Sequence, residues 1–568
     1  MSEQPIHSTT FNAITSAQKS RQHKEYSNPY AKKQYLIVDS VPEMQRALAM
    51  TLTSFGAEKV EYAGKASDAL VKLMRYDFDV VLCDFDLGNG NDGLYLLEEA
   101  KERNLLKQSC VFMIVSGERR AAKVLSAAEL VPDDYLLKPF TGEVLAERLE
   151  RAMRRRDAFR FVDEALLNHE YLAAIDACNK KIAERSEFTL DFMKLKGSLS
   201  LKIGDYDSAR ALYEQVLKVR ELPWAQLGMA KALASLKQVE PALALFHRIV
   251  TENEQVMEAY DWLARLYQGN HELEQAQQVL KRATELAPAT IRRHKALAEV
   301  ALQNGDLAQA KDAYGTTLEL SKSSWHRNPV LYATLARTQL ACGEKVEAIK
   351  TLASLRRDYK YKPEGEWMAD VLDSQIQHHG GNKPQAEKLL HAAAERMAQL
   401  EKLSAEEKME FARTCYAQGQ RALGDDVAGR LIRNHHDNEQ LLQRLSAMFS
   451  QLGMAEAGAD LIMHNVQGMV DLNNQAVREA QAGEHDKAIA MFRQALQEMP
   501  DSTQLMLNLV NAVIAQVHLK GWHESHVREA YDYLQKVRQV APANNKLQKL
   551  MQAWRVLLEK HNKREFLL

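Results

Sequence analysis

A small residue returns at nearly constant intervals through most of the chain, and this repeat constrains the fold more than any other feature. The intervals are 35, 33, 34, 34 and 38 residues between Ala174, Ala209, Ala242, Ala276, Ala310 and Ala348. About twelve residues before most of these positions stands a second small residue, in turn Gly197, Gly228, Ala264, Ala298 and Ala336. Small residues let two helices approach closely, so this period predicts stacked helix pairs.

Two segments show the pair most clearly: "AYDWLARLYQGNHELEQAQQVLKRATELAP" (259–288) and "NNQAVREAQAGEHDKAIAMFRQALQEMP" (473–500). In both, the closing proline ends the second helix. The pattern resembles the tetratricopeptide repeat (TPR). This resemblance implies a superhelix of nine to eleven helix pairs, whose concave face would hold a peptide or helix of an unknown protein partner. Single aromatic residues such as Trp262 are expected to be core, so no peptide-binding residues are predicted.

The first third has a different rhythm, in which short β-branched runs alternate with amphipathic segments. The predicted strands are "QYLIVD" (34–39), "KVEYA" (59–63), "DVVLCD" (79–84), "VFMIVS" (111–116) and "DYLLK" (134–138). Alternation of this kind predicts a parallel sheet covered by helices. The expected fold is therefore α/β followed by all-α.

Polar residues end four of these strands: Asp39, Asp84, Ser116 and Lys138. In an open parallel sheet, ligands bind beyond the carboxyl ends of the strands, where the strand order reverses. Two carboxylates there can hold Mg²⁺, and a lysine with a hydroxyl can bind a phosphoryl group. The pattern predicts a phosphoryl-transfer site.

The segments "LIVDS", "VVLCDFDL", "MIVSGE" and "DYLLKPF" together resemble the receiver domain of bacterial two-component response regulators. The resemblance covers about 120 residues and implies a flavodoxin-like, CheY-like (βα)5 fold. It implies that Asp84 is the phosphoacceptor, and that Asp39, Asp84 and the backbone carbonyl of Asp86 hold Mg²⁺. It further implies that Ser116 and Tyr135 are switch residues.

The same resemblance makes Lys138 the phosphate-binding lysine. The sequence departs from the family at Ser40, where receivers usually carry a second acid that contacts the metal. One missing charge at about 4 Å from the ion is worth several kcal/mol at an effective dielectric near 20, so weakened Mg²⁺ binding is expected. Glu43, one helical turn on, is a candidate for contact through water. The loop "DLGNGNDGLYLL" (86–97) is one residue longer than the common form.

Other features mainly exclude functions. The formal charge is −2, so no overall basic field favours nucleic acid; six arginines in "ERLERAMRRRDAFR" (147–160) are interpreted as a solvated linker face. The pairs at 378–379 and 435–436 are adjacent histidines, which point about 100° apart on a helix, so no metal is expected there. Five separated cysteines, no signal peptide and no run of about 18 apolar residues predict a cytoplasmic protein without membrane contact. No catalytic motif follows residue 160, so no enzymatic output is predicted.

These signals predict a domain layout. It comprises a disordered tail (1–32), the receiver (33–150), a helical linker (151–165), TPR repeats (166–358), diverged helical repeats (359–465), TPR repeats (466–543), and a capping helix with a tail (544–568).

Three functional hypotheses follow. In the first, a sensor histidine kinase or phosphotransfer protein phosphorylates Asp84, and the repeats relay that state through protein contacts. In the second, a degenerate receiver docks another regulator and the repeats act as a scaffold without phosphate. The third, direct contact with DNA through Arg154 to Arg156, is disfavoured because no DNA-binding motif follows them.

Overall fold

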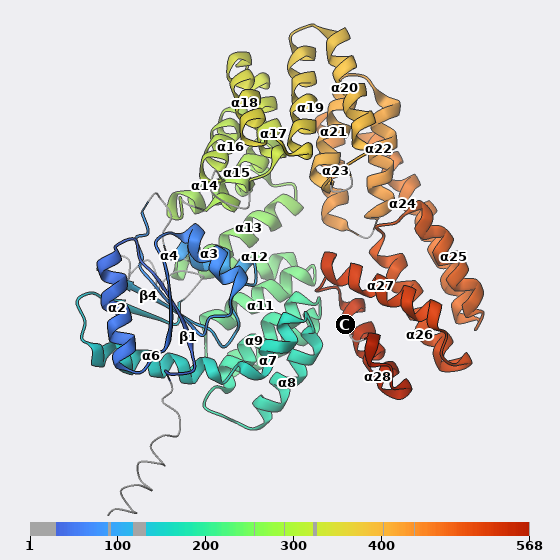
Figure 1. Cartoon of the computed structure of the whole chain (residues 1–568). Helices are drawn as coiled ribbons and strands as arrows, with labels where there is room; N and C mark the ends of the chain where they lie inside the picture. The colour runs from blue at the N-terminus through green and yellow to red at the C-terminus, as the bar shows by residue number, and fades with distance from the viewer. Residues whose placement is uncertain are drawn as a thin grey trace, which may run out of the picture. The chain divides into compact units, whose positions relative to one another are not determined.

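We analysed a computed structural model of the chain, which describes residues 30–88, 93–117, 132–254, 256–288, 290–321, 327–400, 403–436 and 438–566. The chain forms two compact units, Met1–Leu167 and Asn168–Leu568. Figure 1 shows the sheet of the first unit and the helices of the second. Each unit is described by itself below.

The first unit is the predicted parallel α/β sheet. Its strands are β1 (Gln34–Val38), β2 (Lys59–Ala63), β3 (Val80–Cys83), β4 (Val111–Ser116) and β5 (Asp134–Leu137), in the spatial order β2-β1-β3-β4-β5. All four neighbouring pairs are parallel. The order reverses at β1, which lies between β2 and β3, so the predicted binding position falls at the ends of β1 and β3.

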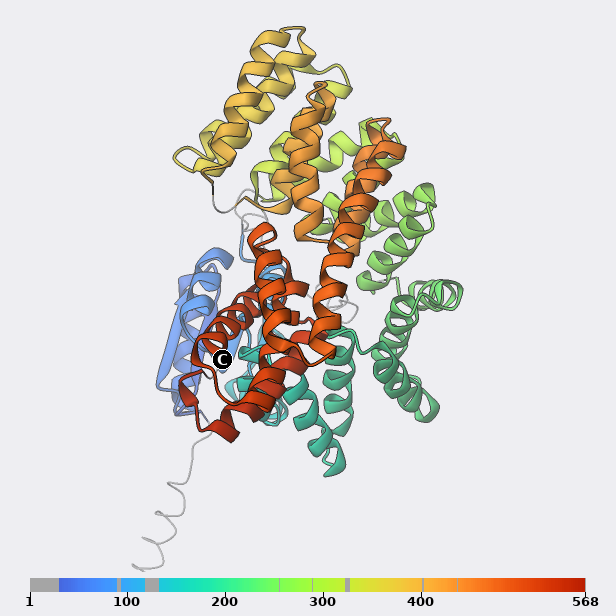
Figure 2. The ribbon, with the colours of Figure 1, turned by 90° about the vertical axis from the view of Figure 1, so that its right-hand side faces the viewer.

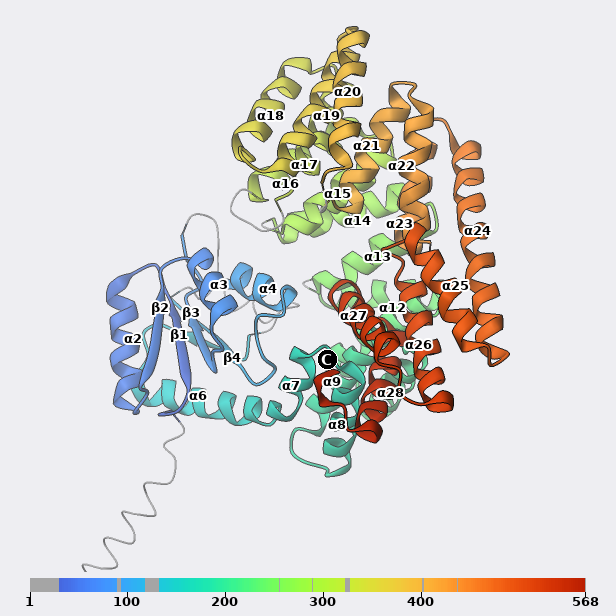
Figure 3. The same cartoon turned by 45° about the vertical axis from the view of Figure 1, so that its right-hand side comes forward.

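Helices cover both faces of this sheet (Figure 3). They are α2 (Pro42–Ser54), α3 (Ala66–Arg75), α4 (Gly93–Glu102) and α6 (Gly142–Asp157), and α7 (Arg160–Leu167) follows at the end of the unit. Leu36 of β1 packs in one apolar cluster with α3 and α4, whereas Tyr35 packs in another with α2 and α6. Successive side chains of a strand point to opposite faces, which explains this division. The helix predicted between β4 and β5 lies outside the described residues.

Every element in the described residues of the second unit is a helix, and the unit begins with α8 (Tyr171–Ala183), α9 (Thr189–Lys202), α10 (Tyr206–Val219), α11 (Pro223–Ser235), α12 (Val239–Glu252), α13 (Met257–Gly269) and α14 (Leu273–Leu286). It continues with α15 (Ile291–Gln303), α16 (Leu307–Ser321), α17 (Pro329–Ala341), α18 (Lys345–Asp358), α19 (Pro363–His379), α20 (Lys383–Met397) and α21 (Ala405–Ala417). It ends with α22 (Arg421–Asn434), α23 (Glu439–Gln451), α24 (Ala455–Gln481), α25 (His485–Glu498), α26 (Thr503–Lys520), α27 (Glu524–Val540), α28 (Asn545–His561) and a 3-10 turn (Arg564–Phe566).

The small residues of the repeat lie where the sequence places a close approach. A Cβ atom on Gly197 would come within 2.6 Å of the Tyr213 ring, and Gly228 contacts the same ring from the next helix pair. Tyr213 is therefore clamped between two glycines, and a side chain at either position would displace it. Many turns between paired helices also need a positive φ, as at Gly305 with a φ of 80°.

The segment 359–465, where the repeat signal is weak, consists of the same helix pairs. Small residues still mark the close approaches: Ala386 follows Ala348 by 38 residues, Gly424 follows after another 38, and Gly458 after 34. Gly424 packs against the Tyr416 ring and Gly458 against the Phe449 ring. The divergence is therefore in the spacing and in the aromatic partner, and the packing principle is unchanged.

The end of the second unit differs from the simple capping helix expected for residues 544–560. Helix α28 contacts α8, the first helix of the same unit, so the run of helices closes on itself (Figures 2 and 3). The contact uses Gln548 and Arg555, whose polar side chains gave no periodic signal in the sequence. Among the described residues, no helix is both long and apolar enough to cross a membrane.

Candidate functional site

Two carboxylates lie at the carboxyl edge of the sheet because their strands are neighbours. Asp39 follows β1 and Asp84 follows β3, and these strands pair in parallel from Tyr35 and Val80 onward. The Asp84 N–H donates to the Val38 carbonyl at 2.7 Å, which carries the ladder to the end of the strand. The sheet therefore places both acids side by side.

Lys138 joins the two acids. Its Nζ donates to Oδ2 of Asp39 at 3.0 Å and to Oδ2 of Asp84 at 2.7 Å. The exposed fractions of the side chains are 1% for Asp39, 16% for Asp84 and 17% for Lys138, so Asp84 remains reachable from solvent while Asp39 does not. The arrangement presents one accessible carboxylate next to a fixed positive charge.

The single positive charge of Lys138 lies between two negative carboxylates, and the pKa values of Asp84 and Lys138 are shifted accordingly. Burial raises the pKa of Asp84, and the nearby charge of Asp39 adds to this, against the lowering effect of the Lys138 hydrogen bond. Burial alone would lower the pKa of Lys138, but the hydrogen bonds to Asp84 and Asp39 outweigh it, and that pKa is raised. Lys138 is therefore held as a cation, whereas Asp84 is only partly compensated.

The remaining carboxylate oxygens also have donors. Oδ1 of Asp39 accepts from the Val41 N–H at 2.8 Å, and Oδ1 of Asp84 accepts from the Asp86 N–H at 3.3 Å. Ser40, the residue between Asp39 and Val41, is exposed. Glu43 forms an ion pair at 2.9 Å with Arg46, one turn along the same helix, and both side chains are exposed at the surface.

The donor set fits Mg²⁺ in type but is small. Asp39 and Asp84 supply the hard oxygen ligands that Mg²⁺ prefers, and the ion usually keeps several waters with one or two carboxylates. Within the described ranges, no group of three or more His, Cys, Asp or Glu side chains is placed to hold a metal. The weakening of Mg²⁺ binding by Ser40 stays a prediction.

The other predicted residues lie near this edge. Ser116 ends β4 and is 3% exposed, and its carbonyl accepts from the Lys138 N–H at 2.8 Å. Tyr135 lies in β5 and packs against the cluster formed by β1, α3 and α4. The Asp86 carboxylate accepts from the Gly88 N–H at 2.9 Å. Residues 89–92 of the predicted long loop lie outside the described residues.

Sequence reasoning missed Gly93, the first residue of α4. A Cβ atom there would collide with the backbone carbonyl of Asp84, and the Gly93 N–H donates to the Phe85 carbonyl at 2.7 Å. Glycine is therefore required for α4 to start directly behind the acid. The only signal available was a glycine at the start of a predicted helix.

The arginine-rich segment is largely occupied within the first unit. Arg148 and Arg151 pair with Asp134 at 2.8 and 3.4 Å, and Arg156 pairs with Asp133. Arg151, Arg154 and Arg155 are nevertheless exposed, as the solvated face expected from the sequence requires. The pairs offset part of the positive charge that a polyanion would need.

The adjacent histidines do not form a metal site among the residues that the structure describes. His436 is 8% exposed, with Nδ1 3.0 Å from the Arg433 carbonyl and Nε2 3.0 Å from Oε1 of Gln504. Both of its ring nitrogens already have protein partners, so its role is structural.

Known protein families match residues 35–150 of the first unit and residues 195–290 of the second. The response regulator receiver domain family matches residues 35–150. The chemotaxis protein CheY-3 of Vibrio cholerae serotype O1 is 32% identical over 120 residues, which cover 21% of this chain and 91% of that protein. The chemotaxis protein CheY of Pseudomonas aeruginosa is 31% identical over 120 residues, with 95% of its length covered.

The helical unit matches two tetratricopeptide repeat families, at residues 195–256 and 258–290. Among solved structures, a two-component response regulator from Clostridium difficile is 24% identical with a TM-score of 0.20, covering 22% of this chain and 98% of that one. NtrX from Brucella abortus is 26% identical with a TM-score of 0.21, covering 23% of this chain and 29% of that one.

Proposed function

Because residues 35–150 belong to the response regulator receiver family and tetratricopeptide repeats follow them, we propose that this chain is a response regulator phosphorylated on Asp84, whose repeats signal through protein contacts. The observation that carries the proposal is the Asp84 carboxylate, 16% exposed and bonded to Lys138 at 2.7 Å. We further propose that the domain boundaries predicted from the sequence, from the receiver (33–150) to the capping helix and tail (544–568), are those of the protein.

In the proposed reaction, an Asp84 carboxylate oxygen forms a bond to the donor's phosphorus. The bond from phosphorus to the donor's leaving atom breaks, and that atom keeps the electron pair and takes a proton from solvent. Lys138 offsets negative charge on the transferred group, since its raised pKa keeps it protonated. Mg²⁺, when bound by Asp39, Asp84 and the Asp86 carbonyl, supplies further charge neutralisation.

The proposed response to phosphorylation uses Ser116 and Tyr135. Ser116 is buried at the end of β4, next in the sheet to the strand that carries Asp84. Its hydroxyl would turn toward the new phosphoryl oxygens, and Tyr135 would follow inward on the neighbouring β5. The surface of β5 and α6 would then change, and a partner that distinguishes the two surfaces would be gained or lost.

The proposed partners are proteins. A sensor histidine kinase or phosphotransfer protein would act as the phosphodonor for the receiver, and a protein of unknown identity would bind the repeats. The output would be binding without enzymatic turnover. A reducing compartment such as the cytoplasm suits the five cysteines, all of which are thiols and four of which are buried.

The scaffold alternative is favoured by one observation. Ser40 lacks the charge of the usual second acid, and Lys138 already occupies one oxygen of each remaining carboxylate. In that case the receiver would dock a partner in a single state and the repeats would hold another. Phosphate would play no part.

Labelling with acetyl phosphate and Mg²⁺, read by intact mass, separates the two proposals. We expect the wild type to gain one phosphoryl group and Asp84→Ala to gain none. Asp86→Ala is the matched control, because its exposed carboxylate is removed while its backbone carbonyl stays. Equal absence of label in wild type and Asp84→Ala supports the scaffold.

A further inference from the structure

The first helix of the repeat unit is capped by the last helix of the chain. At the start of α8, Glu170 occupies the N-cap position, but its side chain makes no capping hydrogen bond. Gln548 of α28 takes that role, because its Oε1 accepts from the Leu172 N–H at 3.3 Å. Its Nε2 also donates to the His169 carbonyl at 2.6 Å. The Leu172 N–H of the first turn is thus satisfied by a residue 376 positions away.

A charge pair reinforces this cap. Arg555, two turns along α28 from Gln548, forms an ion pair with Glu170, whose side chain is 9% exposed. A carboxylate at a helix N-terminus is also favoured by the helix dipole. Gln548 is 2% exposed, so separation of the helices would strand several buried polar groups unless water reached all of them together. The contact should therefore open as one step.

The joint between α8 and α28 differs in chemistry from the packing within the repeats. Among the described residues, the apolar cluster of the C-terminal repeats runs from Ala476 to Phe566 and includes none from α8. The bonds recorded across the joint are hydrogen bonds and an ion pair. Elsewhere, consecutive repeats share buried aromatic side chains, as Tyr213 does. A polar joint of this kind can open without exposing a large apolar surface.

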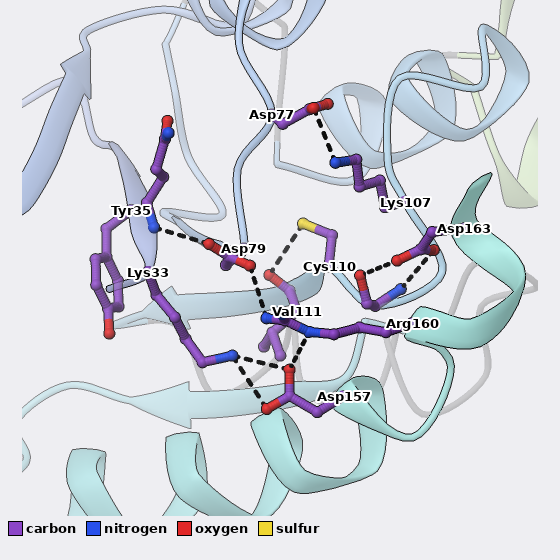
Figure 4. Close-up of polar contacts among 12 residues, drawn as sticks. Lys33, Tyr35, Asp77, Asp79, Lys107, Cys110, Val111, Asp157, Arg160 and Asp163 are labelled. Carbon is purple, nitrogen blue, oxygen red and sulfur yellow. Dashed lines mark hydrogen bonds and ion pairs between the residues drawn. The ribbon is translucent and has the colours of Figure 1, made fainter. Parts of the chain in front are cut away.

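The segment just before this joint is fixed to the receiver. Arg160 at the start of α7 pairs with Asp79 at 3.2 Å and with Asp157 at 3.0 Å (Figure 4). Asp163 of α7 accepts a hydrogen bond from the Ser109 N–H at 3.2 Å. These contacts lie at the amino ends of the strands, the edge opposite Asp84. Two residues after α7 ends, His169 enters the joint, so movement of α6 and α7 would reach it along the chain.

We propose that α28 is a latch that closes the repeat unit by capping α8, and that phosphorylation of the receiver releases it. The release half rests on the proposed function, since it needs phosphate on Asp84. Release converts a closed run of helices into an open superhelix and exposes the first turn of α8 and the Gln548 face of α28. Only a latch with different stability in the two receiver states can be switched in this way.

Hydrogen exchange on the full chain, read by mass spectrometry, tests the latch. We expect Gln548→Ala to raise exchange in peptides covering 168–178 and 545–560 roughly tenfold, because the cap of α8 is lost. Arg555→Ala should have a smaller effect in the same peptides. Gln443→Ala and Arg430→Ala are matched controls, since each removes a side-chain contact within its own helix, to Glu439 in α23 and to Asp426 in α22. Unchanged exchange at 168–178 in Gln548→Ala overturns the latch.

The release half is tested with acetyl phosphate and Mg²⁺ on the same proteins, with the label at Asp84 measured in each sample. We expect labelled wild type to exchange faster at 168–178, Asp84→Ala to stay slow, and Gln548→Ala to be fast in both states. Labelled wild type with unchanged exchange overturns release and leaves the proposed function standing. An unlabelled wild type overturns both, and the latch is then judged on Gln548→Ala alone.

Discussion

The receiver and the repeats use their residues in opposite ways. In the receiver, Asp39, Asp84 and Lys138 meet within about 3 Å, and the surrounding sheet exists to hold them there. In the repeats, the recurring residues such as Gly228 and Tyr213 are spent on packing one helix pair against the next. A single substitution in the first unit should therefore stop phosphorylation of Asp84 without unfolding that unit. A single substitution in the second unit should destabilise the helix pairs without changing the reaction at Asp84.

The largest expected effect breaks the receiver alone. Lys138→Met removes the cation shared by Asp39 and Asp84 and should slow labelling by acetyl phosphate roughly a hundredfold, as loss of one charge-stabilising donor typically does. The repeats should unfold as in the wild type. Lys72→Ala is the control, because that lysine pairs with Glu61 at the surface of the same unit. Labelling at the wild-type rate in Lys138→Met would contradict the site.

The next effect breaks the repeats alone. Gly228→Ala drives a methyl group into the Tyr213 ring and should lower the free energy of unfolding by about 1–3 kcal/mol. Gly315→Ala, which meets open space in the middle of α16, should instead raise it by about 0.5–1 kcal/mol. All six tryptophans lie beyond residue 223, so tryptophan fluorescence during urea unfolding reports the repeat unit. Equal effects of the two substitutions would show that the glycine contact is not tight.

A third substitution sharpens the receiver side. Ser40→Asp restores the missing acid and should tighten Mg²⁺ binding about tenfold, measured by calorimetry, even after most of the added charge interaction is offset by desolvation. Ser54→Asp adds the same charge at an exposed position of α2 and should change little. Unchanged Mg²⁺ affinity in Ser40→Asp would mean that residue 40 does not face the ion.

The smallest effect concerns pH at the joint of the repeats. Burial, followed by the charges of Lys202 and Arg538, lowers the pKa of His169, whose Nδ1 lies 3.2 Å from the Tyr171 hydroxyl. The neutral ring is therefore favoured in the closed joint, and stability present above the ordinary pKa is lost as the pH falls toward the lowered one. After correction for the slower intrinsic amide exchange at lower pH, we expect exchange at 168–178 to rise a few fold on acidification below pH 6.5 in the wild type. In His169→Gln this rise should disappear.

Sequence reasoning could predict what neighbouring strands or regular periods encode. Parallel strands deliver their last residues to one edge, so Asp39, Asp84 and Lys138 were predictable neighbours. Gly424 and Gly458 were missed because their intervals change while their packing does not. The Gln548 cap of α8 could not be predicted, because one polar residue in a helix carries no period and its partner lies 376 positions away. The pairing of Arg148 with Asp134 could not be predicted either, because a run of charged residues does not indicate which opposite charges it contacts.

Closure of the helical unit has a consequence for how it comes apart. An open solenoid has two terminal repeats that fray, because each is covered on one side only. Here the first helix, α8, and the last helix, α28, contact each other, so local opening is expected at this one contact and not at two separate ends. Proteolysis of the native chain should accordingly begin near residue 170 or near residue 545, and the fragments should stay associated through the rest of the helix stack.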